Sequence, residues 1–447
     1  MSKNKYKTII LKFALLALVF LGLVNPNGQF DMYLGLAGSL TLLLFFLKKL
    51  KLPLWFYFIG VGLAYLADQQ FANLEIKALP ILLIAGLVLS LVSISYAYLK
   101  KYPQILLTGL LLVFLLTSWQ NSSQLRTYLS ANPQNGTYTH DMGLYLKTYY
   151  NMEKQNYYQA HLEAFKYHSV PTQGPRDVWG WRLPTVFYLW RLIPIQNGLA
   201  IHFELLLMFS LNLIAIYEIA KQLLPAKLQF VSIVFPYLLL PYLHFAARDW
   251  TMLQIEWWAI SFTLWASWAF IKQKTWLTVL LLSLAVCSRE LLLIPIGLIA
   301  LIALVKKWPK RFAYMIPVLA FSGMLIIHTF EIAQLVPLAK NASTFKLRFH
   351  GEGAALFMTT FAFGSWEYLL YAFRIFLGIY LVAIVGLLLS LQKYSAWFLP
   401  YFILPISYLV IGTSHWNHAW GVLYMPIVFL SLPLVLANIY DKLNIKL

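Results

Sequence analysis

The chain has 447 residues, of which 61% are hydrophobic and only 11% are charged. Soluble domains carry roughly 25% charged residues, so this composition excludes an ordinary soluble protein and indicates an all-α, polytopic integral membrane protein. The net charge of +18 would suggest a polyanion partner in a soluble protein. In a membrane protein basic cytoplasmic loops explain it, so no nucleic acid is expected. The single cysteine, Cys287, excludes an intramolecular disulfide and a multi-cysteine metal site.

Apolar runs that are long enough to cross a bilayer recur along the chain, and they predict about 14 transmembrane helices (about 12–14). The predicted helices cover residues 9–24, 31–47, 52–67, 78–99, 103–118, 201–220, 228–246, 252–271, 275–288, 291–305, 312–330, 367–391, 396–412 and 421–437. The first is expected to be retained, because its basic start and apolar run lack a small-residue cleavage site.

The helices and the polar segments between them divide the chain into five parts. These are the N-terminal transmembrane helices (1–118), an extracytoplasmic loop (119–200), core transmembrane helices with short outer turns (201–330), a second extracytoplasmic loop (331–366) and the C-terminal transmembrane helices (367–447). The first loop is rich in Tyr and Trp, which fits short helices lying in the membrane interface and also fits sugar stacking.

Lysine and arginine gather in alternate loops of this topology. The basic positions on that side include Lys3, Lys5, Lys48, Lys49, Lys100, Lys101, Lys221, Lys272, Lys274, Lys306, Lys307, Lys442 and Lys446. Cytoplasmic loops of membrane proteins carry this excess of positive charge. The pattern therefore predicts a multi-pass protein of the plasma or inner membrane, with both termini cytoplasmic and the two large loops outside.

A few charged residues lie at or inside predicted spans, where each costs about 2.5–3.5 kcal/mol unless it is paired or reaches a cavity or interface. Arg289 and Glu290 either form a structural ion pair that caps two short helices or belong to a site. Glu256 is either bonded to a neighbouring Trp or Ser or belongs to the same site. Asp141 is either a loop turn or helix N-cap, or a functional carboxylate.

Four short segments follow one another with a consistent sidedness. They are His140-Asp141-Met142-Gly143-Leu144-Tyr145, Trp181-Arg182-Leu183-Pro184, Arg248-Asp249-Trp250-Thr251 and Ser288-Arg289-Glu290. In this order, segment 139–311 resembles the GT-C glycosyltransferases, which are polytopic enzymes that use sugars linked to a polyprenyl phosphate. Membrane mannosyltransferases and aminoarabinose transferases are enzymes of this kind.

The resemblance implies transfer of a sugar from a polyprenyl-phosphate donor to an unknown extracytoplasmic hydroxyl acceptor on a cell-envelope glycan, a lipid or a protein. Asp141 would act as the base, and Asp249 would orient the acceptor or share a divalent metal (Mg or Mn) with Asp141; no cofactor is otherwise implied. Arginines would bind the donor phosphate. The phosphate candidates are Arg182, Arg248 and Arg289, and the supporting candidates are His140, Glu256, Glu290, His415 and His418.

Three other functions remain open alternatives: a membrane transporter, a glycan polymerase or ligase, and a flippase-like or accessory subunit without catalysis. Charged residues in spans also mark the pathways of membrane transporters, and a glycan polymerase or ligase would share the lipid-phosphate donor. Transporters tend to contain inverted repeats, and no internal repeat is evident in this sequence. The long outer loop with its acidic and aromatic residues favours an enzyme.

Overall fold

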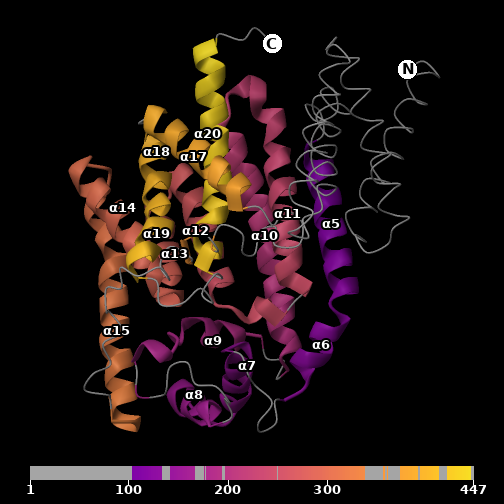
Figure 1. The fold of residues 1–447 in the computed structure, drawn as a ribbon, viewed down its shortest axis with the longest axis vertical. Coiled ribbons are helices and arrows are strands. Elements are labelled where there is room, and N and C mark those ends of the chain that lie inside the picture. The colour runs from indigo at the N-terminus through magenta and orange to yellow at the C-terminus, as the bar shows by residue number, and fades with distance from the viewer. Residues whose placement is uncertain are drawn as a thin grey trace, which may run out of the picture.

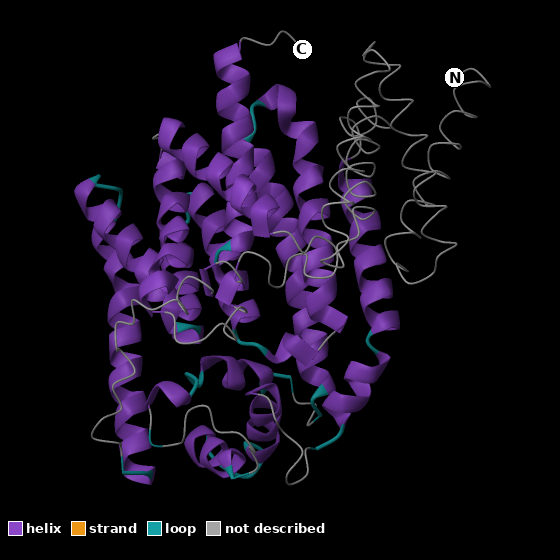
Figure 2. Cartoon of the chain, viewed as in Figure 1, coloured by secondary structure: helices purple, strands orange, loops and turns teal. Residues whose placement is uncertain are grey.

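The computed structural model describes residues 103–132, 141–166, 176, 178–193, 197–248, 250–337, 356–357, 360, 373–390, 393–411 and 420–443. Every regular element in these ranges is a helix, as Figure 2 shows, which confirms the all-α prediction. The predicted helices at 9–24, 31–47, 52–67 and 78–99 lie outside the described residues, as does most of the predicted loop 331–366.

Short helices form a layer across one end of the molecule. After the long helix α5 (Pro103–Asn121) come α6 (Ser123–Ser130), α7 (Asp141–Asn151), α8 (Tyr157–Phe165), the 3-10 turn η2 (Val178–Gly180) and α9 (Thr185–Trp190). Figure 1 shows α7, α8 and α9 beneath the ends of the long helices. The Asn156 side chain starts α8 by accepting a hydrogen bond from the backbone N–H of Gln159 at 2.9 Å. Segment 119–200 therefore contains the short helices that its sequence predicts.

The remaining helices, most of them long, form the bundle above this layer. They are α10 (Leu199–Leu223), α11 (Val234–Arg248), α12 (Glu256–Ile271), α13 (Thr275–Ser288), α14 (Leu293–Val305), α15 (Ile316–Leu335), α17 (Phe373–Ser390), α18 (Lys393–Phe398), α19 (Ile403–Ile411) and α20 (Met425–Leu443). Short 3-10 segments connect several of them: η3 (Ala226–Ile233), η4 (Trp250–Leu253), η5 (Glu290–Leu292), η6 (Arg311–Met315) and η7 (Leu399–Phe402). Helix α12 packs against α10 and α13, α13 packs against α15, and α17 packs against α20.

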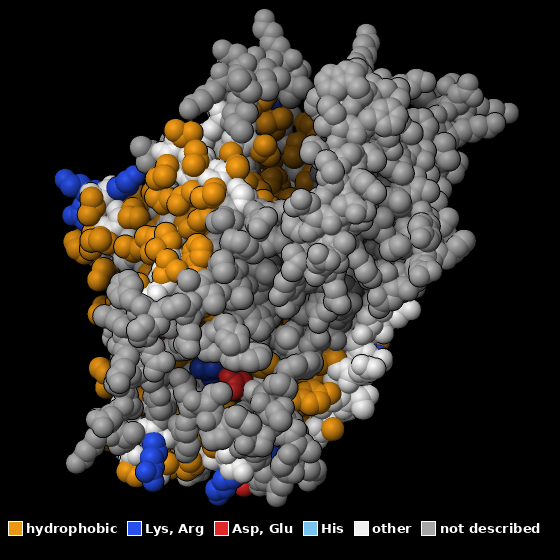
Figure 3. Space-filling model, in the orientation of Figure 1, with side chains coloured by type: hydrophobic (Ala, Val, Ile, Leu, Met, Phe, Trp, Pro, Cys, Tyr) orange, Lys and Arg blue, Asp and Glu red, His pale blue; other side chains and the backbone are white. Residues whose placement is uncertain are grey.

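By length and composition, three helical segments in the described part of the chain could cross a membrane: Leu199–Leu223, Arg311–Leu335 and Trp420–Asn438. Shorter apolar helical stretches of 10–17 residues also occur there, such as Thr275–Ser288 and Glu290–Val305. Figure 3 shows hydrophobic side chains over part of the surface of the bundle. Large apolar residues of α15, such as Leu319 and Ile326, are exposed as well. Apolar surface of this extent fits contact with lipid. The membrane character is thus supported, and the number of about 14 crossings stays a prediction.

The turns that carry much of the predicted cytoplasmic charge meet at one end of the bundle. Lys272, after α12, pairs with Glu218 of α10 at 3.8 Å. Phe270 of α12 stacks on Trp397 of α18 with ring centroids 4.1 Å apart. Lys310, before η6, lies 5.6 Å from the centroid of the Trp276 ring at the start of α13. These basic turns and the layer of α7–α9 lie at opposite ends in Figure 1. Which end faces the cytoplasm stays a prediction.

Close backbone contacts fix the layer of short helices to the bundle. Gly198, just before α10, lies so near the carbonyl of Leu129 in α6 that an added Cβ would collide with it. On α10 itself, the His202 Nε2 lies 2.9 Å from the Ala247 carbonyl of α11, and its ring stacks on Trp119 of α5. Helices α5, α6, α10 and α11 are therefore joined where the bundle meets the layer.

Candidate functional site

Asp141 is the first residue of α7, at the end of the helix where backbone N–H groups favour negative charge. Its side chain is 43% exposed. Tyr145 lies one helical turn further along, and residues four apart share one face of a helix. The carboxylate and the phenol hydroxyl can therefore contact the same partner.

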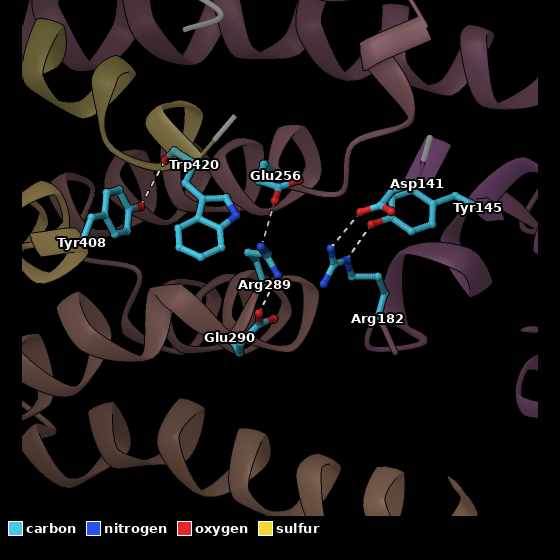
Figure 4. A network of polar contacts seen from close by, with 8 residues as sticks. All are labelled: Asp141, Tyr145, Arg182, Glu256, Arg289, Glu290, Tyr408 and Trp420. Atoms are coloured by element: carbon cyan, nitrogen blue, oxygen red, sulfur yellow. Dashed lines mark hydrogen bonds and ion pairs between the residues drawn. The ribbon is translucent and has the colours of Figure 1, made fainter. Parts of the chain in front are cut away.

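That partner is Arg182, which lies between η2 and α9 (Figure 4). Its Nε donates to the Tyr145 hydroxyl at 2.6 Å, and its Nη2 donates to Asp141 Oδ2 at 3.3 Å. Its backbone carbonyl accepts a hydrogen bond from the Tyr157 hydroxyl of α8. Arg182 thus ties α7 and α8 together, while 18% of its side chain remains exposed.

The surroundings of Arg182 and Tyr145 determine the protonation state of each side chain. Burial works against the charged form of Arg182, but the nearby Tyr145, Asp141, Glu290 and Glu256 outweigh it and raise the pKa of Arg182 above its ordinary value. Burial also raises the pKa of Tyr145. At neutral pH the guanidinium is therefore a cation and the phenol keeps its proton.

A second charged cluster lies where α13 ends. Arg289 follows α13 in extended conformation, and its side chain is only 1% exposed. Its Nε forms an ion pair with Glu256 Oε1 at 2.8 Å, and its Nη1 donates to Glu290 Oε1. The guanidinium carbon lies 5.5 Å from the ring centroid of Trp420, within reach of a cation–π contact. Two carboxylates and an aromatic ring therefore surround Arg289 (Figure 4).

A hydrogen bond joins the loop that carries Arg182 to the end of α13, which Arg289 follows. The Thr185 hydroxyl, at the start of α9, donates to the carbonyl of Cys287 near the end of α13 at 2.7 Å. Thr185 is three residues after Arg182, and Cys287 is two residues before Arg289. The two loops are therefore neighbours, which agrees with the effect of Glu256 and Glu290 on Arg182. Together the loops form one site at the junction of the short-helix layer and the bundle.

The structure brings together part of the predicted set of site residues. Asp141 and Arg182 are in contact, and the other cluster contains Arg289, Glu290 and Glu256. The predicted Arg289–Glu290 ion pair is present, and Glu256 pairs with Arg289 rather than with a Trp or Ser. Arg248 is the last residue of α11, and its side chain is not described. Asp249, His140, His415 and His418 lie outside the described residues.

A divalent metal at Asp141 and Asp249 stays a prediction, because only Asp141 is described. Among the described residues, no group of three or more His, Cys, Asp or Glu side chains is arranged to hold a metal ion. The Asp141 carboxylate faces Arg182 at 3.3 Å, so a metal there would have to share that carboxylate with a guanidinium.

The sequence does not predict that Tyr145, Tyr157 and Trp420 contact the two arginines, as they do in the structure. For Tyr145 a signal existed, because four residues after Asp141 is one helical turn. For Tyr157 and Trp420 no comparable signal exists, since each meets an arginine that is distant in the sequence.

His161 holds α8 against α7 beside this site. Its Nδ1 lies 2.8 Å from the Thr148 hydroxyl of α7, and its ring stacks on Tyr157. Burial, with a smaller contribution from Arg182, lowers the pKa of His161 from 6.5 to about 3. The imidazole is therefore neutral at physiological pH and serves packing in this layer.

Comparison of the chain with protein-family models, with curated proteins and with solved structures finds no match in any of the three. The function is therefore inferred from the short segments quoted from the sequence and from the geometry of the site.

Proposed function

We propose that this chain is a membrane glycosyltransferase that moves a sugar from a polyprenyl-phosphate donor to a hydroxyl acceptor on the extracytoplasmic side of the membrane. The observation that carries the proposal is the contact between the half-exposed Asp141 carboxylate and the Arg182 guanidinium at one end of the bundle. A base for the acceptor and a cation for the lipid phosphate are thereby adjacent. The short-helix layer holds both at the level where a lipid headgroup would enter.

The reaction needs one proton acceptor and one stabiliser of negative charge. The acceptor hydroxyl gives its proton to the Asp141 carboxylate while its oxygen forms the bond to the anomeric carbon of the sugar. The bond between that carbon and the phosphate oxygen breaks, and its electron pair stays on the phosphate. A guanidinium positioned beforehand, in a site with little water, stabilises this charge best.

Arg182 suits the phosphate better than Arg289 does. Its planar guanidinium can offer paired N–H groups to phosphate oxygens, and 18% of its side chain is exposed. Arg289 is 1% exposed and two carboxylates already surround it. We therefore assign the phosphate contact to Arg182 and a supporting, structural role to Arg289, with Glu256 and Glu290 holding it.

The position of the charged residues supports a transferase over a transporter. Asp141 opens α7 and Arg182 precedes α9. Figure 1 shows α7 and α9 beneath the ends of the long helices rather than within the bundle. Substrate sites of transporters lie near the midplane. A glycan polymerase or ligase would use the same donor chemistry, and the acceptor would distinguish it.

Replacing the proposed base tests this function. Membrane vesicles containing the wild-type chain or Asp141→Asn are supplied with a panel of polyprenyl-phosphate sugars and cell-envelope acceptors, and labelled product is measured. Since a general base contributes 10²–10⁴-fold, Asp141→Asn should lower transfer by at least about 100-fold. Glu153→Gln is the matched control, because Glu153 is an exposed acid in the turn after α7 and should leave transfer unchanged.

The outcomes separate the function from the assignment of the base. Wild-type activity in Asp141→Asn would show that another group takes the proton. Absence of transfer by the wild-type chain from every polyprenyl-phosphate donor, with the protein correctly inserted, would refute the proposed function itself.

A further inference from the structure

The buried hydroxyl of Tyr145 requires an explanation that packing alone does not supply. Its ring is 4% exposed and contacts Phe187 of α9 edge-on, with centroids 5.8 Å apart. A phenylalanine would fill the same space. A hydroxyl in such a place costs free energy unless it has a partner. Its partner is the Nε of Arg182 at 2.6 Å, so the hydroxyl serves the arginine rather than the core.

The two hydrogen bonds that hold the Arg182 guanidinium from α7 differ in strength. The bond from Nε to Tyr145 is short, at 2.6 Å, and its acceptor belongs to a buried side chain. The contact from Nη2 to Asp141 is longer, at 3.3 Å, and reaches a carboxylate that is 43% exposed. Ion pairs that are open to solvent contribute little and exchange readily. The Asp141 contact is thus the one that an incoming anion can replace.

We propose that Tyr145 is a positioning residue that holds Arg182 by its Nε while the Nη2 edge of Arg182 passes from the Asp141 carboxylate to the phosphate of the lipid donor. This inference rests on the proposed function. The exchange does two things at once: it gives the phosphate a fixed cation, and it releases the Asp141 carboxylate to take the acceptor proton. Donor binding therefore precedes activation of the acceptor.

The loop that carries Arg182 is itself fixed, which makes such an exchange geometrically simple. The Tyr157 hydroxyl holds the backbone carbonyl of Arg182, and Thr185 is bonded to the end of α13. With both sides of the loop tied and Nε held by Tyr145, the guanidinium keeps its place while the exposed Asp141 side chain turns away and the phosphate takes its position at Nη2. No helix has to move.

Binding of decaprenyl phosphate to the purified full chain in detergent tests the inference without knowledge of the sugar. Decaprenol, which lacks the phosphate, measures the contribution of the lipid tail alone. The wild-type chain should bind decaprenyl phosphate more tightly than decaprenol. Tyr145→Phe keeps the ring and should weaken binding of decaprenyl phosphate by about tenfold or more, because a hydrogen bond to a charged group is lost. Its binding of decaprenol should not change.

Two further comparisons distinguish positioning from a structural effect. Tyr149→Phe removes a buried hydroxyl from the same helix, one that donates to the carbonyl of Asn197, and should leave both affinities unchanged. In an Arg182→Ala background, adding Tyr145→Phe should change neither affinity, because the group that it positions is absent. A merely structural role would lower the affinities in both backgrounds.

Asp141→Asn tests the exchange directly. Removing the competing charge should tighten binding of decaprenyl phosphate roughly two- to fivefold, the equivalent of one exposed ion pair. Weaker binding in this variant would overturn the exchange, and unchanged binding in Tyr145→Phe would overturn the positioning role while leaving the proposed function intact. If the wild-type chain does not distinguish decaprenyl phosphate from decaprenol, the proposed lipid-phosphate donor itself is refuted.

Discussion

The buried ion pair between Arg289 and Glu256 offers the sharpest test of the structure. In Arg289→Met the replacement side chain has about the length of the apolar stem of arginine, so most of the packing of that stem is kept. The guanidinium is lost, however, and Glu256, whose side chain is 7% exposed, remains buried without its cation. Glu290 suffers less, because 24% of its side chain is exposed and can be hydrated.

Breaking a buried pair by removing one partner costs about 3–5 kcal/mol, because it leaves an uncompensated buried charge. Loss of the contact between Arg289 and the Trp420 ring adds about 0.5–2 kcal/mol. We therefore expect Arg289→Met to lower the free energy of unfolding by about 4 kcal/mol or more. Adding Glu256→Gln to this variant removes the unpaired charge and should restore at least about half of the loss.

The assay is reversible unfolding of the purified chain in mixed micelles, titrated with denaturing detergent. Lys272→Met is the matched control, because it removes the cation of the pair with Glu218, in which both side chains are 32% exposed. The decrease in the free energy of unfolding of Lys272→Met should stay below about 1 kcal/mol. A loss below about 1 kcal/mol in Arg289→Met, or an equal loss in Lys272→Met, would refute the claim that the Arg289 cluster is a buried structural element.

Three further predictions follow from other parts of the structure. The pKa of His161 falls from 6.5 to about 3 on folding, so its contribution to stability is complete above pH 6.5 and is lost as pH falls from 6.5 toward 3. Thermal unfolding should therefore show roughly 1–2 kcal/mol of destabilisation between pH 6.5 and 5 that is absent in His161→Phe. Gly198→Ala should destabilise by about 1–3 kcal/mol because its Cβ meets the Leu129 carbonyl, whereas Gly297→Ala, with nothing within 4 Å, should be neutral or stabilising in a melting experiment. Lys154 lies in an exposed turn of the short-helix layer, so a membrane-impermeant maleimide should label Lys154→Cys only from outside the cell. The native Cys287 is buried and should not react. Labelling from the cytoplasmic side would contradict the predicted topology.

Hydropathy located helices well where polar residues bracket an apolar run. The predicted helix 275–288 has the same bounds as α13, because Lys274 precedes it and Arg289 follows it. It located them less well where proline interrupts the hydrogen bonds. The predicted helix 396–412 is divided into α18, η7 and α19, and η7 begins at Leu399-Pro400. Proline lacks the N–H that an α-helix needs at that position, and a hydropathy average does not detect this.

The site could be predicted only in part, for a similar reason. From the sequence one can infer that a charged residue inside a membrane span needs a partner, but not which residue that partner is. Glu256 and Arg289 are far apart in the chain, and their contact depends on how α12 packs against α13. The contact between Asp141 and Arg182 was expected only because the order of the motifs resembles a known family. Local spacing predicts only contacts within one helix, such as the shared face of Asp141 and Tyr145.

The exposure of the carboxylates around each arginine explains the different roles proposed for the two cations. Arg289 lies between two carboxylates and has almost no exposed surface, so an incoming phosphate would have to displace a buried acid and leave it unpaired. Among the described partners of Arg182 are the exposed Asp141 carboxylate and the neutral Tyr145 phenol, so a phosphate that replaces the carboxylate returns that acid to water at little cost. In the proposed mechanism the same residue type thus acts as a fixed structural cation in one loop and as an exchangeable anion ligand in the other, and Tyr145 keeps Arg182 in position when Asp141 is released.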